Sequence, residues 1–135
     1  GFLKAMKENK INFEEKNLYE VINYSYNDGI DVMEKIVKDK NVPEAIFCAA
    51  GDMCALGVIK VARENNLKIP EQLSIIGYDD IDQAKTSKPA LTTIRQPIEQ
   101  IASAAFLYAT NEGKTILNNP KKVVFKAELV ERETV

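Results

Sequence analysis

The sequence contains no histidine and no tryptophan, and only two of its 135 residues are cysteine. Without histidine the chain lacks the commonest general base, and arrangements of the Ser-His-Asp or Cys-His type are excluded. A zinc site made of cysteine and histidine ligands is nearly excluded for the same reason. The sequence also contains no nucleophile elbow, P-loop or dinucleotide-binding fingerprint. We therefore predict that the chain is not an enzyme and binds neither a metal nor a cofactor.

Neither sign of charge dominates, since 18 basic and 20 acidic side chains leave a formal net charge of −2. Because these charges are interspersed, no basic face is available to neutralise the phosphates of a nucleic acid. No apolar run approaches the ~20 residues of a membrane-spanning helix, and no signal peptide is visible. We expect no membrane association and no direct DNA contact from this stretch. Cys48 and Cys54 are expected to be buried, unpaired thiols in a reduced cytoplasm.

Strand-like and helix-like segments alternate along the chain. The expected strands cover residues 18–24, 45–50, 73–78, 91–95, 123–125 and 128–131. The expected helices cover residues 2–9, 27–39, 52–65 and 98–111, and residues 81–88 are expected to be irregular or a short helical turn. The last helix is expected to bury Ile101, Ala102, Ala105 and Tyr108. This order predicts an α/β fold, with a parallel sheet, right-handed crossovers and helices on both faces.

Two of the expected strands end in acidic residues. Strand 45–50 runs into Gly51-Asp52, and strand 73–78 runs into Asp79-Asp80. In an open α/β sheet, ligands bind outside the carboxyl ends of the strands, so we predict a ligand site at this edge. Asp79 is the stronger candidate, because no regular helix follows it at once and Asp80 adds a like charge nearby. Asp52 has a second interpretation, since an Asp just before a helix is a good N-cap.

The motifs around these residues occur in a recognisable order. They read Ala50-Gly51-Asp52, Ala55-Leu56-Gly57, Asn66-Leu67-Lys68-Ile69-Pro70, Ser74-Ile75-Ile76-Gly77-Tyr78-Asp79-Asp80 and Pro89-Ala90-Leu91-Thr92-Thr93-Ile94-Arg95-Gln96-Pro97, with matching ends at 1–6 and 128–134. In this order they resemble the effector-binding core of the lactose/galactose repressor (LacI/GalR) family of bacterial transcription regulators. The resemblance covers almost the whole chain, although any one motif alone would be weak.

The resemblance implies a type I periplasmic-binding-protein-like fold that is only partly present. Residues 1–94 look like an incomplete C-terminal subdomain, and 95–120 look like the returning strand and helix of the N-terminal subdomain. Residues 121–135 would be the closing strands, and the DNA-binding domain would be absent from this chain. A fragment is also indicated by the first residues, which open in mid-helix without a capping residue. Thr93 and Arg95 lie in a crossing segment that would act as a hinge, and a second crossing is expected near 119–122.

The same resemblance implies the effector contacts. Asp79 matches the acidic residue that hydrogen-bonds the effector, and Tyr24 matches an aromatic residue that packs on it, with Tyr26 as the alternative. Gln96 and Ile98 would line the cleft from the other side. Gly51 stands where many relatives carry Asn, so that Asp52 either compensates for the missing contact or only caps its helix. The complete set of predicted effector residues is Tyr24, Asp52, Asp79, Gln96 and Ile98.

Helix 52–65 has a second role by resemblance. The side chains of Ala55, Val58 and Ala62 would allow close packing against the same helix of a second subunit. Ordinary packing on the sheet is the simpler interpretation, and both can hold for different faces of the helix. We expect a homodimer.

These observations predict a cytoplasmic, non-enzymatic effector-binding and dimerisation module of a LacI/GalR-type regulator. A small molecule, namely a sugar or sugar phosphate, would bind between the subdomains and control operator DNA binding through a helix-turn-helix domain outside this chain. The alternative is an extracytoplasmic sugar-binding receptor of a transport system, which shares the fold. The Pro-x-Leu-Thr-Thr-Ile motif, the Glu-Arg-Glu-Thr ending and the two cysteines favour the regulator. An α/β enzyme is the weakest interpretation, because no Lys, Ser or Thr stands at a telling spacing from Asp79-Asp80 for Mg²⁺ chemistry.

Overall fold

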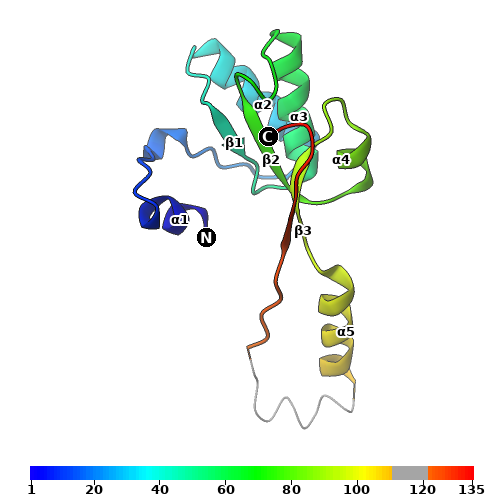
Figure 1. Cartoon of the computed structure of the whole chain (residues 1–135). Coiled ribbons are helices and arrows are strands. Elements are labelled where there is room, and N and C mark those ends of the chain that lie inside the picture. Colours follow the sequence, from blue (N-terminus) through cyan, green and yellow to red (C-terminus); the bar gives the residue numbers. More distant parts are fainter. Residues whose placement is uncertain (111–121) are drawn as a thin grey trace.

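A four-stranded sheet organises the chain, whose computed structural model describes residues 1–110 and 122–135 (Figure 1). The strands are β1 (Ala45–Phe47), β2 (Ser74–Asp79), β3 (Thr92–Arg95) and β4 (Glu128–Val130), in the spatial order β1-β2-β3-β4. The first three strands are parallel, but β4 runs antiparallel to β3. The α/β class is therefore confirmed, and the predicted parallel sheet is a mixed one. The reason is that the chain leaves the sheet through β3 and returns beside it.

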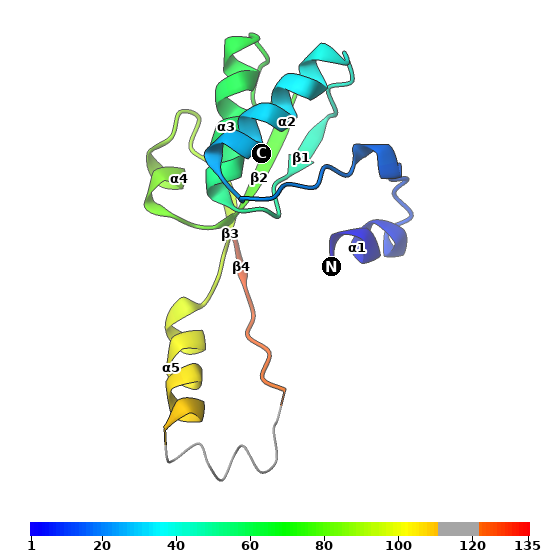
Figure 2. The same cartoon turned by 180° about the vertical axis from the view of Figure 1, so that it is seen from behind.

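One face of the sheet is covered by α2 (Tyr26–Lys38) and α3 (Asp52–Glu64), as Figure 2 shows. The main apolar core lies beneath them and includes Met33, Val58 and Ile75, which are at most 1 % exposed. The two helices approach closely at two glycines. A Cβ added at Gly29 would lie 2.0 Å from the Cys54 carbonyl oxygen, and one added at Gly57 would lie 2.1 Å from the Tyr26 carbonyl oxygen. Only glycine fits at these two positions, because any side chain would push the two helix backbones apart.

Helix α2 begins one residue earlier than predicted, because Ser25 caps it. The Ser25 hydroxyl accepts a hydrogen bond from the Asp28 backbone N–H at 3.2 Å, and the Asp28 carboxylate accepts one from the Ser25 backbone N–H at 2.8 Å. This reciprocal pair is a capping box, which satisfies two backbone donors that a helix start leaves free. The box therefore fixes the point at which the loop before α2 ends.

The opposite face of the sheet is only lightly covered. Helix α1 (Phe2–Glu8) has no buried residue, and it reaches the sheet through Phe2, which stacks on Phe47 of β1 with ring centroids 5.7 Å apart. The Phe13 ring packs edge-on against Phe2 at 5.4 Å. Since Phe47 and the core residue Ile46 are neighbours in one strand, they point to opposite faces. The prediction of helices on both faces is thus confirmed, although α1 contributes little burial.

Two predicted strands do not form. Residues 18–24 contain no strand and follow a short 3₁₀ helix, η1 (Glu15–Asn17). Their alternating pattern had no strand beside it, since β1 pairs only with β2 among the described residues, and Tyr19 instead packs under Lys35 of α2. Residues 123–125 likewise form no strand. Residues 81–88, which were predicted to be irregular or a short helical turn, contain a short helix, α4 (Asp82–Thr86).

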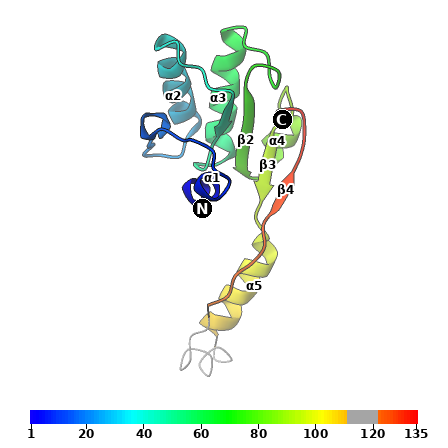
Figure 3. The same ribbon diagram turned by 60° about the vertical axis from the view of Figure 1, so that its left-hand side comes forward.

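Helix α5 (Ile98–Ala109) projects away from the sheet, beside the segment that leads into β4 (Figure 3). The predicted burial of its apolar stripe is wrong in this chain. Ile101 is 37 % exposed, Ala102 and Ala105 are exposed, and only Tyr108 is half-buried. The reason is that no other described element packs against α5 (Figure 1). The expected helix end and the second crossing near 119–122 lie largely outside the described residues. No helix in the described part of the chain is long and apolar enough to cross a membrane.

Candidate functional site

Asp79 and Gln96 meet where β2 and β3 end. These strands are parallel, and Asp79 of β2 lies beside Arg95 of β3 in their register. Gln96, which follows Arg95, therefore lies at the same edge of the sheet as Asp79. The Gln96 side-chain amide donates a hydrogen bond to Asp79 Oδ1 at 2.6 Å. Asp79 is exposed and has a φ of 118°, a conformation that residues with a side chain rarely adopt. The structure therefore brings two of the predicted effector residues together.

Gly51 completes this edge from the side of α3. Its φ is 104°, and a Cβ added to it would lie 2.9 Å from Asp79 Oδ2. A side chain at position 51 would thus be strained and would crowd the carboxylate. Among the described residues no donor is hydrogen-bonded to Asp79 Oδ2, so this oxygen remains able to accept a bond from a ligand.

Asp52 lies behind this surface and is 0 % exposed. The capping interpretation is wrong, because the N-cap of α3 is Gly51 and no side chain caps the helix. Instead, Asp52 Oδ1 accepts a hydrogen bond from the Thr93 hydroxyl at 2.5 Å, and Oδ2 accepts one from the Ile81 backbone N–H at 2.9 Å. Burial raises the pKa of Asp52 above its ordinary value of 3.8, and the nearby charge of Asp79 adds to this effect. The arrangement leaves Asp52 no accessible oxygen for direct contact with an effector.

Asp80 forms an ion-pair cluster that the sequence analysis missed. Its side chain is 3 % exposed, and it accepts hydrogen bonds from Arg95 Nε at 2.6 Å and from Arg132. Burial alone would raise the pKa of Asp80, but the two guanidinium groups outweigh burial and hold it below 3.8. Arg95 also contacts Glu128 on β4 at 3.4 Å. The signal in the sequence was the acidic pair itself, but one of the two basic partners of Asp80, Arg132, lies 52 residues away.

The remaining predicted effector residues are open to solvent. Tyr24 is 65 % exposed and lies in the loop before α2 with a φ of 53°. Ile98 is 58 % exposed and is the first residue of α5. Tyr26, the alternative aromatic residue, lines a different groove, next to α3 and α4. Their positions are compatible with ligand contact, which stays a prediction.

The predicted hinge residues differ in their surroundings. Thr93 is fully buried and bound to Asp52, whereas the Arg95 side chain is 47 % exposed. Burial thus decreases along β3 towards the crossing. If this segment bends, the bend is confined to its end, because its start is held in the core.

The three residues predicted to contact a second subunit are buried in the core. Ala55 and Ala62 are 0 % exposed and Val58 is 1 % exposed, all within the core. The predicted contact of these residues with a second subunit is therefore wrong, because side chains covered by α2 and the sheet present no surface to a partner. The simpler interpretation, packing within the chain, is the one observed.

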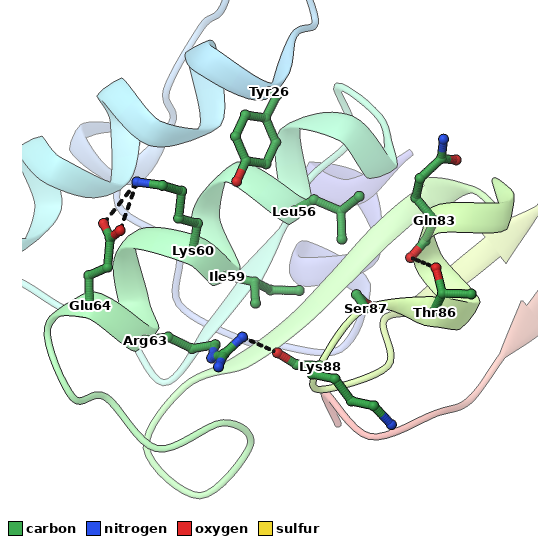
Figure 4. A pocket seen from close by; sticks show the side chains of 10 residues that line it. All are labelled: Tyr26, Leu56, Ile59, Lys60, Arg63, Glu64, Gln83, Thr86, Ser87 and Lys88. Atoms are coloured by element: carbon green, nitrogen blue, oxygen red, sulfur yellow. Dashed lines mark hydrogen bonds and ion pairs between the residues drawn. The ribbon is translucent and has the colours of Figure 1, made fainter.

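The outer side of α3 instead borders a groove of about 660 Å³, shown in Figure 4. Apolar side chains of α3 form its floor, and charged and polar side chains of α3 and α4 form its rim. In this groove Lys60 pairs with Glu64 at 2.9 Å, and Arg63 donates to the Lys88 carbonyl oxygen at 2.8 Å. The lining residues are Tyr26, Leu56, Ile59, Lys60, Arg63, Glu64, Gln83, Thr86, Ser87 and Lys88.

Cys48 and Cys54 are both buried and unpaired, as predicted. Within residues 1–110 and 122–135, no three cysteine, aspartate or glutamate side chains are grouped so as to hold a metal ion. The acidic residues at the sheet edge take part in hydrogen bonds and ion pairs within the chain.

The periplasmic binding protein-like domain family matches residues 1–135. The HTH-type transcriptional repressor PurR of Yersinia enterocolitica is 36 % identical over 135 residues, which make up 100 % of this chain and 39 % of that protein. The chain therefore spans well under half the length of this curated relative.

Solved structures show the same fold. A LacI-type regulator from Bifidobacterium animalis matches with a TM-score of 0.81 at 22 % identity, over 99 % of this chain and 48 % of that one. A LacI family regulator from Lactobacillus casei with bound sucrose matches with a TM-score of 0.77 at 26 % identity, over 99 % of this chain and 49 % of that one. At 22 % identity the first likeness concerns the fold alone.

Proposed function

Because the chain belongs to the periplasmic binding protein-like domain family, in the form found in LacI/GalR transcription regulators, we propose that it is the effector-binding part of a DNA-binding regulator. The observation that carries this proposal is the meeting of Asp79, Gln96 and Gly51 at the carboxyl edge of the sheet. This edge adjoins the point where β3 leads out of the sheet to α5 (Figure 3). A ligand bound there would contact both sides of the crossing.

The effector is a small molecule with hydrogen-bond donors, namely a sugar or sugar phosphate. Asp79 Oδ1 is held by Gln96, which orients the carboxylate and leaves Oδ2 to accept from a ligand hydroxyl. Tyr24 and Ile98 would supply apolar surface against the flat face of the ligand. The Lactobacillus casei relative with bound sucrose supports the sugar class.

Regulation would follow from movement at the crossing. Binding between Asp79 on the sheet side and Gln96 and Ile98 on the α5 side favours one relative orientation of the two parts. In the complete regulator this orientation would set how a helix-turn-helix domain meets its operator, which is a coupling free energy between two sites. Such a protein works in the cytoplasm, where its DNA is.

A homodimer would form through the groove beside α3 rather than through the buried residues. Leu56 provides apolar contact, and Lys60 and Glu64 provide charges of both signs on one surface. A twofold interface brings the same patch together with itself, so that Lys60 of one copy can face Glu64 of the other.

The direct test is effector binding by the complete gene product. Sucrose, cellobiose and adenine would be titrated calorimetrically into the wild-type protein, Asp79→Asn and the control Asp82→Asn, whose carboxylate is 93 % exposed on α4. A probe that binds the wild type should bind Asp79→Asn at least roughly tenfold more weakly, because the acceptor of its hydrogen bond is no longer charged. The control should match the wild type. Equal affinity in Asp79→Asn would contradict the site, and adenine as the only binder would contradict the sugar class.

A further inference from the structure

Asp52 connects three separate parts of the chain. It starts α3, and its two carboxylate oxygens bind Thr93 of β3 and the Ile81 backbone N–H. Ile81 directly follows the turn that carries Asp79 and Asp80. A buried carboxylate is retained only where hydrogen bonds compensate for its lost hydration, and here both oxygens are compensated from within the chain.

The carboxylate reaches β3 by passing across β2 at Gly77. A Cβ added at Gly77 would lie 2.1 Å from Asp52 Oδ1 and 2.9 Å from a Leu91 methyl carbon. Gly77 is also the register partner of Thr93, the residue that donates to Asp52. A glycine inside a strand marks a close approach by another group, and here that group is the Asp52 carboxylate.

Asp52 therefore contacts both sides of the effector site from behind. On one side it holds the residue after the Asp79-Asp80 turn, and the charge of Asp79 also acts on it. On the other side it holds Thr93, two residues before Arg95 and three before Gln96. The charge that acts on Asp52 is that of Asp79 on β2, and Asp52 in turn contributes to the raised pKa of Cys48, the residue that follows β1.

We propose that Asp52 is a positioning residue that couples the effector carboxylate of Asp79 to the hinge strand β3. This inference rests on the proposed function. When Asp79 changes its position or charge on binding, the turn at Ile81 and the Asp52 carboxylate move with it, and Thr93 follows. The direct bond between Gln96 and Asp79 is a second connection, so the two routes have to be separated by experiment.

The test uses the complete gene product without any ligand. The ¹³C signal of the Asp52 carboxyl carbon would be titrated with pH in the wild type, Asp79→Asn, Thr93→Val and Thr93→Ser. Loss of the Thr93 hydroxyl should raise the Asp52 midpoint by roughly half a pH unit or more, and Thr93→Ser should restore it, because the hydroxyl stabilises the ionised form. Asp79→Asn should lower the midpoint, because a like charge is removed. A residue with only a packing role would not show this pattern.

A second measurement follows the signal to the hinge. The Thr93 methyl ¹³C shift should respond to Asp79→Asn in the wild-type background and should no longer respond in an Asp52→Asn background. A response that persists undiminished there means that coupling runs through Gln96 alone, which overturns the proposal. If Asp52→Asn does not fold, the titration decides. An Asp52 midpoint that is unchanged in Asp79→Asn or not restored by Thr93→Ser also overturns it.

The two hypotheses fail in different experiments. Unchanged probe affinity in Asp79→Asn removes the proposed effector site, whatever the titration shows. An Asp52 midpoint that is insensitive to Asp79 and Thr93 removes the coupling, whatever the probes show.

Discussion

Gln96 donates a hydrogen bond of 2.6 Å to Asp79 across the ends of β3 and β2. Arg95, the last residue of β3, binds Asp80, the first residue after β2, at 2.6 Å. Two consecutive residues at the end of β3, Arg95 and Gln96, thus bind two consecutive residues at the end of β2, Asp80 and Asp79. Asp79 is exposed and Gln96 is half-buried, whereas the Asp80 side chain is only 3 % exposed and is held in an ion-pair cluster.

Asp80→Asn should destabilise the fold by about 2–4 kcal/mol, because it leaves the largely buried Arg132 and the half-buried Arg95 without their anion. Urea unfolding followed by circular dichroism measures this difference. The matched control is Asp82→Asn, whose ion pair with Lys85 is exposed and whose effect should stay within about 0.5 kcal/mol. Equal stability of the two variants would mean that the Asp80 cluster contributes nothing to folding.

Stability should also fall in acid through Asp80. Its folded-state pKa lies below the ordinary 3.8, so its contribution is present above 3.8 and is lost as the pH falls through the folded value. Asp52 acts in the opposite direction. Its raised folded-state pKa means that ionised Asp52 opposes folding at higher pH, and this cost disappears as the pH falls towards 3.8.

The contributions of Asp80 and Asp52 are measured by the pH dependence of the urea midpoint between about pH 6 and about pH 2. The wild type should lose stability below about pH 4, and Asp80→Asn should lose less over that interval because its carboxylate is already absent. If both proteins lose stability equally steeply as the pH falls, the loss is caused by other carboxyl groups.

Gly51→Ala should cost about 1–3 kcal/mol, since an alanine there has to keep a φ of 104° and would place its Cβ 2.9 Å from Asp79 Oδ2. The displaced carboxylate should also lose its bond to Gln96, which the side-chain amide signals of Gln96 would report by NMR. Gly1→Ala is the control, because no atom lies within 4 Å of a Cβ added at Gly1. A Gly51→Ala protein as stable as this control would show that the turn can relax.

Leu56→Asp should weaken self-association about tenfold or more, because it places a charge in the apolar floor of the groove. Analytical ultracentrifugation of the complete gene product measures the dimer, and circular dichroism checks that the variant remains folded. Ile22→Asp is the control, since Ile22 is 87 % exposed and lies away from the groove. A variant that stays folded and fully dimeric would exclude the groove as the interface.

Much of the fold follows from local patterns. The capped α2, the amphipathic α3 and the apolar runs of β1 and β2 carry their period in their own residues, so their types were predictable. Residues 18–24 show where this fails, because alternation makes a strand only if another strand lies beside it, and none does among the described residues. The apolar stripe of α5 fails for a related reason, since no other described element packs against that helix.

Local sequence patterns were sufficient to predict the α/β class, the resemblance to LacI/GalR regulators and the arrival of acidic residues at one edge of the sheet. The role of each acidic residue, in contrast, depends on how the chain folds around it. Asp79 is exposed, Asp80 is ion-paired and Asp52 is enclosed, although all three follow similar strand ends. The physical reason is that burial and pairing depend on distant partners, Thr93 lying 41 residues from Asp52 and Arg132 lying 52 from Asp80. The same holds for α3, where Ala55, Val58 and Ala62 became core because α2 covers them.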